Sequence, residues 1–209
     1  MAEKIIARGA EAILLQQGKK LIKRRIKKSY RIQEIDEKLR KLRTRSEAKL
    51  MMRATSLVNV PKIFAVDEEK KEIVMSFVSG KKLSEWLDSF PLEKAKKLCS
   101  EIGERVAALH AQNIIHGDLT TSNMIFSGKK IYFIDFGLGF FSRRIEDKAV
   151  DIHLFRQALE SKHFLHSQSF FGSFLAGYKK YGEEKVIKKL EKVEVRGRYK
   201  GKRYKEKSF

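Results

Sequence analysis

The sequence predicts an α+β fold of two lobes: a small antiparallel β-sheet lobe with one main helix, and a shortened, mostly helical lobe. Three observations predict this fold. Short apolar runs separated by turns fill residues 1–78, as in β-hairpins. Ser79-Gly80 then forms a natural hinge, and apolar residues recur at helical spacing in residues 79–194. Residues 195–209 form a basic tail, and we expect both lobes to belong to one domain.

In the first lobe, the pattern predicts five strands and one helix. Arg8-Gly9-Ala10-Glu11 is typical of a tight turn between two strands. Apolar residues at helical spacing follow from Ile35 to Leu50 and predict the helix. Within it, Thr44-Arg45-Ser46-Glu47 has the form of a capping box, which allows a break or a fresh helix start near Thr44. The expected strands are residues 5–7, 12–15, 20–26, 63–66 and 73–78, and the expected helix is 34–55.

In the second lobe, helical patterns surround one hairpin. Two apolar runs separated by Ser127-Gly128-Lys129-Lys130 predict the hairpin, with residues 123–126 and 131–134 as its strands. The composition of the tail indicates disorder in the absence of a partner. The expected helices are residues 84–89, 92–112, 148–163, 169–181 and 183–193.

Composition indicates a globular intracellular protein. The 209 residues are 42% hydrophobic, which suffices for a buried core. The single cysteine, Cys99, argues against a disulfide framework, and its amphipathic helical context predicts a buried thiol rather than a nucleophile. No apolar stretch approaches the length that spans a bilayer. We therefore expect a soluble, cytoplasmic protein with no membrane contact.

The net charge of +20 is concentrated in two segments. Residues 19–49 hold 14 Lys or Arg against 4 acidic residues, and residues 195–209 hold 7 against 1. Such segments attract polyanions in a salt-dependent way, which favours a polyanionic partner. The alternative is a solvated surface, as in proteins that are generally rich in Lys and Glu.

The most informative motif is His116-Gly117-Asp118-Leu119-Thr120-Thr121-Ser122-Asn123, followed by Asp135-Phe136-Gly137. Phosphoryl transfer needs a carboxylate that receives or orients the proton of the nucleophile, and oxygen ligands for Mg²⁺ near the triphosphate. Asp118 suits the first role, and Asn123 and Asp135 suit the second. The spacing resembles the catalytic loop and metal-binding turn of protein kinases, and predicts a minimal protein-kinase-like bilobal fold. The alternative is a hairpin whose Asp and Asn residues only serve turns.

Other residues fit a site for ATP. Lys23, on the third strand, stands where kinases place the Lys that holds the α- and β-phosphates, and Glu47 is its expected partner. The capping box is the other interpretation of Glu47. Gly9 allows the turn of a phosphate-binding loop, although this loop lacks the other glycines of G-x-G-x-x-G. Met75 and Phe77, just before the hinge, are expected to contact the nucleotide.

The sequence also departs from ordinary kinases. Gly117 replaces the Arg that in many kinases pairs with a phosphorylated activation loop, so we expect no regulation by that route. Only 72 residues follow Gly137, without an A-P-E sequence, so most of the usual peptide-binding lobe is missing. Asp151 could accept hydrogen bonds from the backbone of the catalytic loop, or could be an ordinary acid near a helix N-terminus.

Together these residues resemble one family, the Bud-thirty-two family, over essentially the full chain. This family is the small atypical kinase subunit of the KEOPS complex. The resemblance rests on these runs: R-G-A-E-A at the loop, I-K-R-R-I-K-K-x-Y-R at the third strand, Arg43-Thr44-Arg45-Ser46-Glu47-Ala48, H-G-D-L-T-T-S-N before D-F-G-L-G, and Val195-Arg196-Gly197-Arg198.

The resemblance implies a Ser/Thr kinase or ATPase that uses ATP and Mg²⁺ and supports formation of threonylcarbamoyl-adenosine at position 37 of tRNA. It implies that Asp118 is the catalytic acceptor, that Asn123 and Asp135 bind the metal, and that Lys23 with Glu47 binds phosphate. It implies two partners, the transferase subunit (Kae-one) on the C-lobe and the small Cgi subunit on the N-lobe. The basic tail could contact tRNA, dock into the partner subunit or fold back over the active site.

Two other functions stay open on the sequence. A small-molecule kinase of the aminoglycoside or choline type also carries an H-G-D loop, but such enzymes usually have long helical insertions that this chain lacks. A pseudokinase-like scaffold or RNA-binding subunit would keep its nucleotide pocket for structure alone. The thin glycine loop favours that interpretation, and the complete set of acid and metal residues opposes it.

Overall fold

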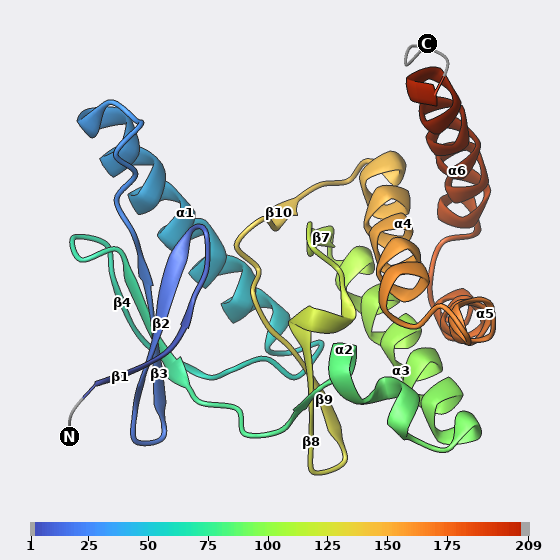
Figure 1. Cartoon of the computed structure of the whole chain (residues 1–209), viewed down its shortest axis with the longest axis horizontal. Helices are drawn as coiled ribbons and strands as arrows, with labels where there is room; N and C mark the ends of the chain where they lie inside the picture. Colours follow the sequence, from blue (N-terminus) through green and yellow to red (C-terminus); the bar gives the residue numbers. More distant parts are fainter. Residues whose placement is uncertain (1–2, 206–209) are drawn as a thin grey trace.

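The first lobe is a five-stranded antiparallel sheet in the order β1-β2-β3-β5-β4 (Figure 1). The computed structural model describes the backbone of residues 3–205 and the side chains of residues 3–195. All five expected strands are confirmed, with ends within two residues of those predicted. They are β1 (Lys4–Arg8), β2 (Ala12–Gln17), β3 (Lys20–Arg25), β4 (Ile63–Asp67) and β5 (Glu72–Ser76).

One long helix, α1 (Gln33–Ala54), lies against this sheet and runs without a break. The break that the capping box allowed near Thr44 does not form, and the Thr44 hydroxyl donates to the carbonyl of Arg40 at 2.8 Å within the helix. Such a bond to the preceding turn satisfies the hydroxyl without ending the helix. Glu47 therefore does not cap a new helix. It lies mid-helix, almost fully buried.

The second lobe is mostly helical, as predicted, and its helices lie on one side of the short β8–β9 hairpin (Figure 1). Its hairpin and the four long helices expected are confirmed. The short strands at residues 81–82, 114–115 and 140–141 were not expected. The elements are β6 (Lys81–Lys82), α2 (Leu83–Trp86), the 3-10 helix η1 (Leu87–Ser89), α3 (Leu92–Ala111), β7 (Ile114–Ile115), the 3-10 helix η2 (Thr121–Asn123), β8 (Met124–Ser127), β9 (Lys130–Phe133), β10 (Phe140–Phe141), α4 (Ile145–Lys162), α5 (Ser167–Lys179) and α6 (Glu184–Lys205).

The last helix is longer than the sequence predicted. We expected it to end near Val193 and to leave a disordered tail, but α6 continues to Lys205. The physical reason is helix propensity: residues 194–205 contain no proline and are mostly Lys, Arg and Glu with few glycines. Residues 206–209 of the tail lie outside the described part of the chain.

Helices α3 and α5 pack with their backbones in close contact. A Cβ on Gly103 would collide with the carbonyl of Phe174, and a Cβ on Gly177 would collide with that of Ser100. Glycine at both positions lets the two helices approach this closely. Cys99 lies on the same helix α3 and is fully buried, as predicted, and burial raises the pKa of its thiol to about 12.

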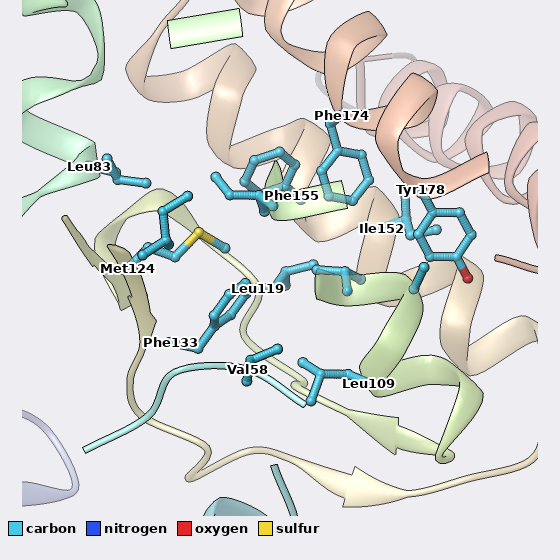
Figure 2. Close-up of a cluster of buried hydrophobic side chains, with 14 of the residues drawn as sticks. Val58, Leu83, Leu109, Leu119, Met124, Phe133, Ile152, Phe155, Phe174 and Tyr178 are labelled. Atoms are coloured by element: carbon cyan, nitrogen blue, oxygen red, sulfur yellow. The ribbon is translucent and has the colours of Figure 1, made fainter. Parts of the chain in front are cut away.

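Apolar side chains from helices and hairpin fill the second lobe (Figure 2). Met124 and Phe133 come from the hairpin, and Phe155 and Phe174 come from α4 and α5; all four are fully buried. Leu119, from the middle of the catalytic motif, belongs to the same cluster. Burying one such side chain stabilises the fold by about 1.5–3 kcal/mol, so the core anchors the motif at Leu119. None of the helices in residues 3–205 combines the length and apolar character needed to cross a bilayer.

Candidate active site

The β8–β9 hairpin brings the two predicted metal ligands together. Asn123 directly precedes β8, and Asp135 follows β9 after one residue. The backbone N–H of Ile134 donates to the carbonyl of Asn123 at 2.9 Å, which closes this end of the hairpin. The predicted hairpin forms, and it places Asn123 and Asp135 at adjacent strand ends.

Asp118 is bonded directly to Asn123. The side-chain amide of Asn123 donates to Asp118 Oδ2 at 2.7 Å and to its backbone carbonyl at 2.9 Å. Both bonds use Nδ2, so Asn123 Oδ1 is available as a ligand for a cation. Asp118 is half-buried and lines a cavity, where its carboxylate can meet a substrate hydroxyl or water.

His116 ties the loop of residues 116–123, called the catalytic loop from here on, to the residue that follows β9. Its Nε2 lies 3.2 Å from the carbonyl of Ile134, and the backbone N–H of Asp118 donates to its Nδ1 at 3.3 Å. These partners define a neutral ring with the proton on Nε2. Burial lowers the pKa of His116, which keeps it neutral despite the nearby carboxylates.

Asp151, on α4, holds the same loop from the other side. Its Oδ2 accepts from the backbone N–H of His116 and its Oδ1 from that of Gly117, both at 2.9 Å. His110 Nε2 lies 3.2 Å from Oδ2, and its Nδ1 lies 3.0 Å from the hydroxyl of Tyr178. Burial alone would raise the pKa of Asp151, but its bonds to His110 and the loop outweigh burial and lower it. Asp151 thus binds the loop backbone, as one of the two sequence interpretations had it.

Gly117 allows two segments to touch. Its φ is +77°, in the left-handed region, and a Cβ there would collide with the carbonyl of Leu138. The segment after Asp135-Phe136-Gly137 therefore packs directly on the catalytic loop. An arginine has no room at this position.

Lys23 binds both Glu47 and Asp135. Its Nζ lies 2.6 Å from Glu47 Oε1 and 2.7 Å from Asp135 Oδ1. Burial would lower the pKa of Lys23, but the two carboxylates outweigh burial and raise it. For Asp135 the signs are reversed: burial alone would raise its pKa, but the ammonium of Lys23 outweighs burial and lowers it. Lys20, on the opposite face of β3, is exposed, as expected from the two-residue period of a strand.

Sequence reasoning missed Arg25, which is the second partner of Glu47. Its Nη2 lies 2.5 Å from Glu47 Oε2, and the residue is only 5% exposed. Its position two residues after Lys23 was the available signal, because alternate residues of a strand share a face. The run of basic residues in this segment obscured it, since most of its other members are exposed or only half-buried.

Two adjoining cavities of about 350 and 380 Å³ lie between the lobes and share Lys23 and Asp135. The first is lined by Gly9, Arg25 and Asp118 among others, and the second by Met75, Phe77, Glu47 and Asn123. All the predicted site residues therefore line one continuous cleft.

The loop at Gly9 is a tight turn that is tied down. The N–H of Gly9 donates to the carbonyl of Ala12 at 2.9 Å. The next acidic residue, Glu11, accepts from Arg43 of α1 at 2.6 Å. The turn predicted from a single glycine thus forms. The ion pair between Glu11 and Arg43 holds this loop in place, whereas a loop with more glycines would be more flexible.

The donor set at the hairpin end suits Mg²⁺. Asn123 Oδ1 and the Asp135 carboxylate are hard oxygen ligands, and Mg²⁺ usually takes one or two protein ligands together with phosphates and water. Asp135 Oδ1 accepts from Lys23 and from the N–H of Gly137, and Oδ2 has no bond to any of the described residues. Within the described side chains, no three His, Cys, Asp or Glu residues cluster as a metal site.

This fold and this site define a kinase-like protein: a sheet lobe with a buried Lys–Glu pair, facing a helical lobe with an Asp–Asn–Asp set. The family model described as "RIO domain" matches residues 12–139. Among curated relatives, "KEOPS complex subunit Bud32" of Pyrococcus abyssi is 45% identical, over 94% of this chain and 96% of the relative. "EKC/KEOPS complex subunit BUD32" of Encephalitozoon cuniculi is 42% identical, over 91% and 93%. The chain belongs to the RIO-domain family and, within it, to the Bud32 proteins.

A longer kind of relative contains the same region. The "Probable bifunctional tRNA threonylcarbamoyladenosine biosynthesis protein" of Methanobrevibacter smithii is 42% identical over 95% of this chain. The chain spans only 37% of that relative.

Proposed function

We propose that this chain is an ATP-dependent atypical Ser/Thr kinase or ATPase. The observation that carries the proposal is the convergence of Lys23, Glu47, Asp118, Asn123 and Asp135 on one cleft between the lobes. Phosphoryl transfer is mostly positioning and electrostatic stabilisation, and this set supplies both.

Each residue has a distinct role in the proposed mechanism. Lys23, held by Glu47, binds the α- and β-phosphates and so orients the nucleotide. Asp118 orients the attacking hydroxyl or water and accepts its proton, while Asn123 fixes the Asp118 carboxylate. Asn123 and Asp135 would hold Mg²⁺, which neutralises charge on the phosphates. Met75 and Phe77 line the part of the cleft next to the hinge, and we assign the adenine ring to this part.

We further propose that the chain acts as the Bud32 subunit of a KEOPS complex and supports threonylcarbamoyl-adenosine formation at position 37 of tRNA. The names of its relatives support this role. Because the second lobe lacks most of a peptide-binding apparatus, ATP hydrolysis is the favoured activity within the complex. A cytoplasmic location belongs to the same proposal.

Each lobe of this chain has exposed apolar side chains that a proposed partner could cover. On the second lobe, Phe164 and Leu165 are 71% and 77% exposed, and we assign that lobe to the transferase subunit (Kae-one). On the first lobe, Ile32 and Ile35 lie exposed near the start of α1, and we assign that lobe to the small Cgi subunit.

The test is phosphate release and autophosphorylation, measured with and without the transferase subunit and tRNA. Asp118→Asn and Asp135→Ala are expected to lower both activities at least about 100-fold. Lys20→Met, on the exposed face of β3, is the control and should keep full activity. If the two active-site variants turned over ATP like the wild type, the proposal would be wrong. The same assays on a chain without residues 195–209 then show whether the tail is needed for ATP turnover itself, for the effect of tRNA or for the effect of the transferase subunit.

A further inference from the structure

Arg25 lies beside Lys23 and shares its anchor. The two residues are two positions apart on β3 and face the cleft, whereas Arg24 faces outward and pairs with Glu72. Glu47 binds Lys23 through Oε1 at 2.6 Å and Arg25 through Oε2 at 2.5 Å. One buried carboxylate thus holds two cations, which is one more than the Lys–Glu pair of the proposed function needs.

Arg25 also has donors to spare. A guanidinium carries five N–H donors, and the one bond described for the Arg25 side chain uses Nη2. Its Nε is buried and finds no acceptor within residues 3–195. A buried donor without a partner is unfavourable, so its presence calls for an acceptor. Arg25 lines the cavity between the Gly9 loop and Asp118, where an acceptor group can enter.

The position of Arg25 on β3 indicates which acceptor group its guanidinium would bind. On β3, Lys20 pairs with Ser76 beside the hinge and Arg24 with Glu72 at the far end of β5, so Arg25 lies farther from the hinge than Lys23. A Cβ on Gly137 would lie 3.4 Å from Arg25 Nη2, so the guanidinium also lies against the turn that follows Asp135. A nucleotide whose base lies at the hinge and whose inner phosphates meet Lys23 would point its last phosphate toward Arg25.

We propose that Arg25 binds the terminal phosphate of ATP and makes the site discriminate ATP from ADP. The inference rests on the proposed function, because it takes ATP as the ligand. The planar fork of an arginine suits this role, because one edge stays on Glu47 while the other meets phosphate oxygens in charge-assisted bonds. Lys23 is assigned to the α- and β-phosphates, and two of its three N–H donors already bind Glu47 and Asp135, so the last phosphate falls to Arg25.

The test compares two ligands on the full chain by titration calorimetry in Mg²⁺: ADP and the β,γ-imido analogue of ATP. For Arg25→Met, the affinity for the analogue is expected to fall about 10- to 100-fold more than the affinity for ADP. Arg24→Met is the matched control on the same strand and should change neither affinity. Thermal unfolding of each variant checks that the fold is intact.

An equal loss for both ligands would overturn the inference, because Arg25 would then only position Glu47 and Lys23. If Arg25→Met does not fold, Arg25→Lys decides the question. This variant keeps the charge beside Glu47 but loses the fork, so a reduced preference for the analogue supports the inference and an unchanged preference overturns it. A wild-type chain that binds neither nucleotide would overturn the proposed function itself, a result visible before any variant is made.

Discussion

Replacing Asp151 with Asn should loosen the catalytic loop without touching its chemistry. Asp151 offers one carboxylate oxygen to the N–H of His116 and the other to the N–H of Gly117. An asparagine has nearly the same shape but only one acceptor oxygen, and its NH₂ group would face one of these two donors. The variant therefore leaves one buried backbone N–H unpaired.

The size of the effect follows from these bonds. A hydrogen bond to a charged group contributes about 1.5–3 kcal/mol, and an unpaired buried donor costs about 1–3 kcal/mol. The two figures describe the loss of the same bond and are not added, so we expect a loss of about 1.5–3 kcal/mol in the free energy of unfolding. That is a large share of the roughly 5–15 kcal/mol of an ordinary domain. Glu160→Gln, on the exposed face of the same helix, removes one surface ion pair and should cost less than about 1 kcal/mol.

The effect should also depend on pH. The folded pKa of Asp151 is lowered, so its stabilisation is fully present above the unfolded pKa of about 3.9 and is lost as the pH falls through the folded value. The difference between wild type and Asp151→Asn is therefore largest at pH 7 and shrinks below about pH 4. Urea unfolding followed by circular dichroism at pH 7 and pH 3.5 measures both points. A difference below about 0.5 kcal/mol at pH 7, or one that does not shrink in acid, would refute this reasoning.

Three further variants or reactions test other parts of the fold. Gly103→Ala should lower the melting temperature by several degrees, because its Cβ meets the carbonyl of Phe174, whereas Gly172→Ala on open α5 surface should be neutral or slightly stabilising. Equal effects of the two would contradict the packing. The thiol of Cys99, with a pKa raised to about 12, should resist a thiol reagent at pH 8 until the chain is unfolded; rapid reaction of the native protein would argue against its burial. Lys23→Met should weaken ATP binding about 10- to 100-fold, measured by calorimetry. An unchanged affinity would show that Lys23 does not bind ATP.

The residues of the site that the sequence predicted are those whose contacts are local or fixed by a simple period. The turn at residues 127–130 determines the register of the hairpin, and the hairpin in turn places Asn123 beside Asp135. Lys23 faces the cleft because alternate residues of a strand share a face. Such short-range rules need no knowledge of the rest of the fold.

The features that the sequence left open depend on contacts between distant segments. Glu47 fits both a capping box and an ion pair, and only the packing of α1 on the sheet decides for the ion pair. In the sequence Arg25 resembles the other basic residues of its segment, and only the same packing buries it. Asp151 acquires its role only because α4 is placed behind the catalytic loop.

The contact between Gly117 and Leu138 also limits how this chain can change by mutation. A signalling kinase carries an arginine where Gly117 stands. Any L-residue there would have to adopt a left-handed backbone, at about 1–2 kcal/mol, and would also strike the carbonyl of Leu138. Acquiring that arginine therefore requires the segment around Leu138 to move away at the same time. The contact that holds the two segments together therefore also resists the substitution on which control by phosphorylation depends in many kinases.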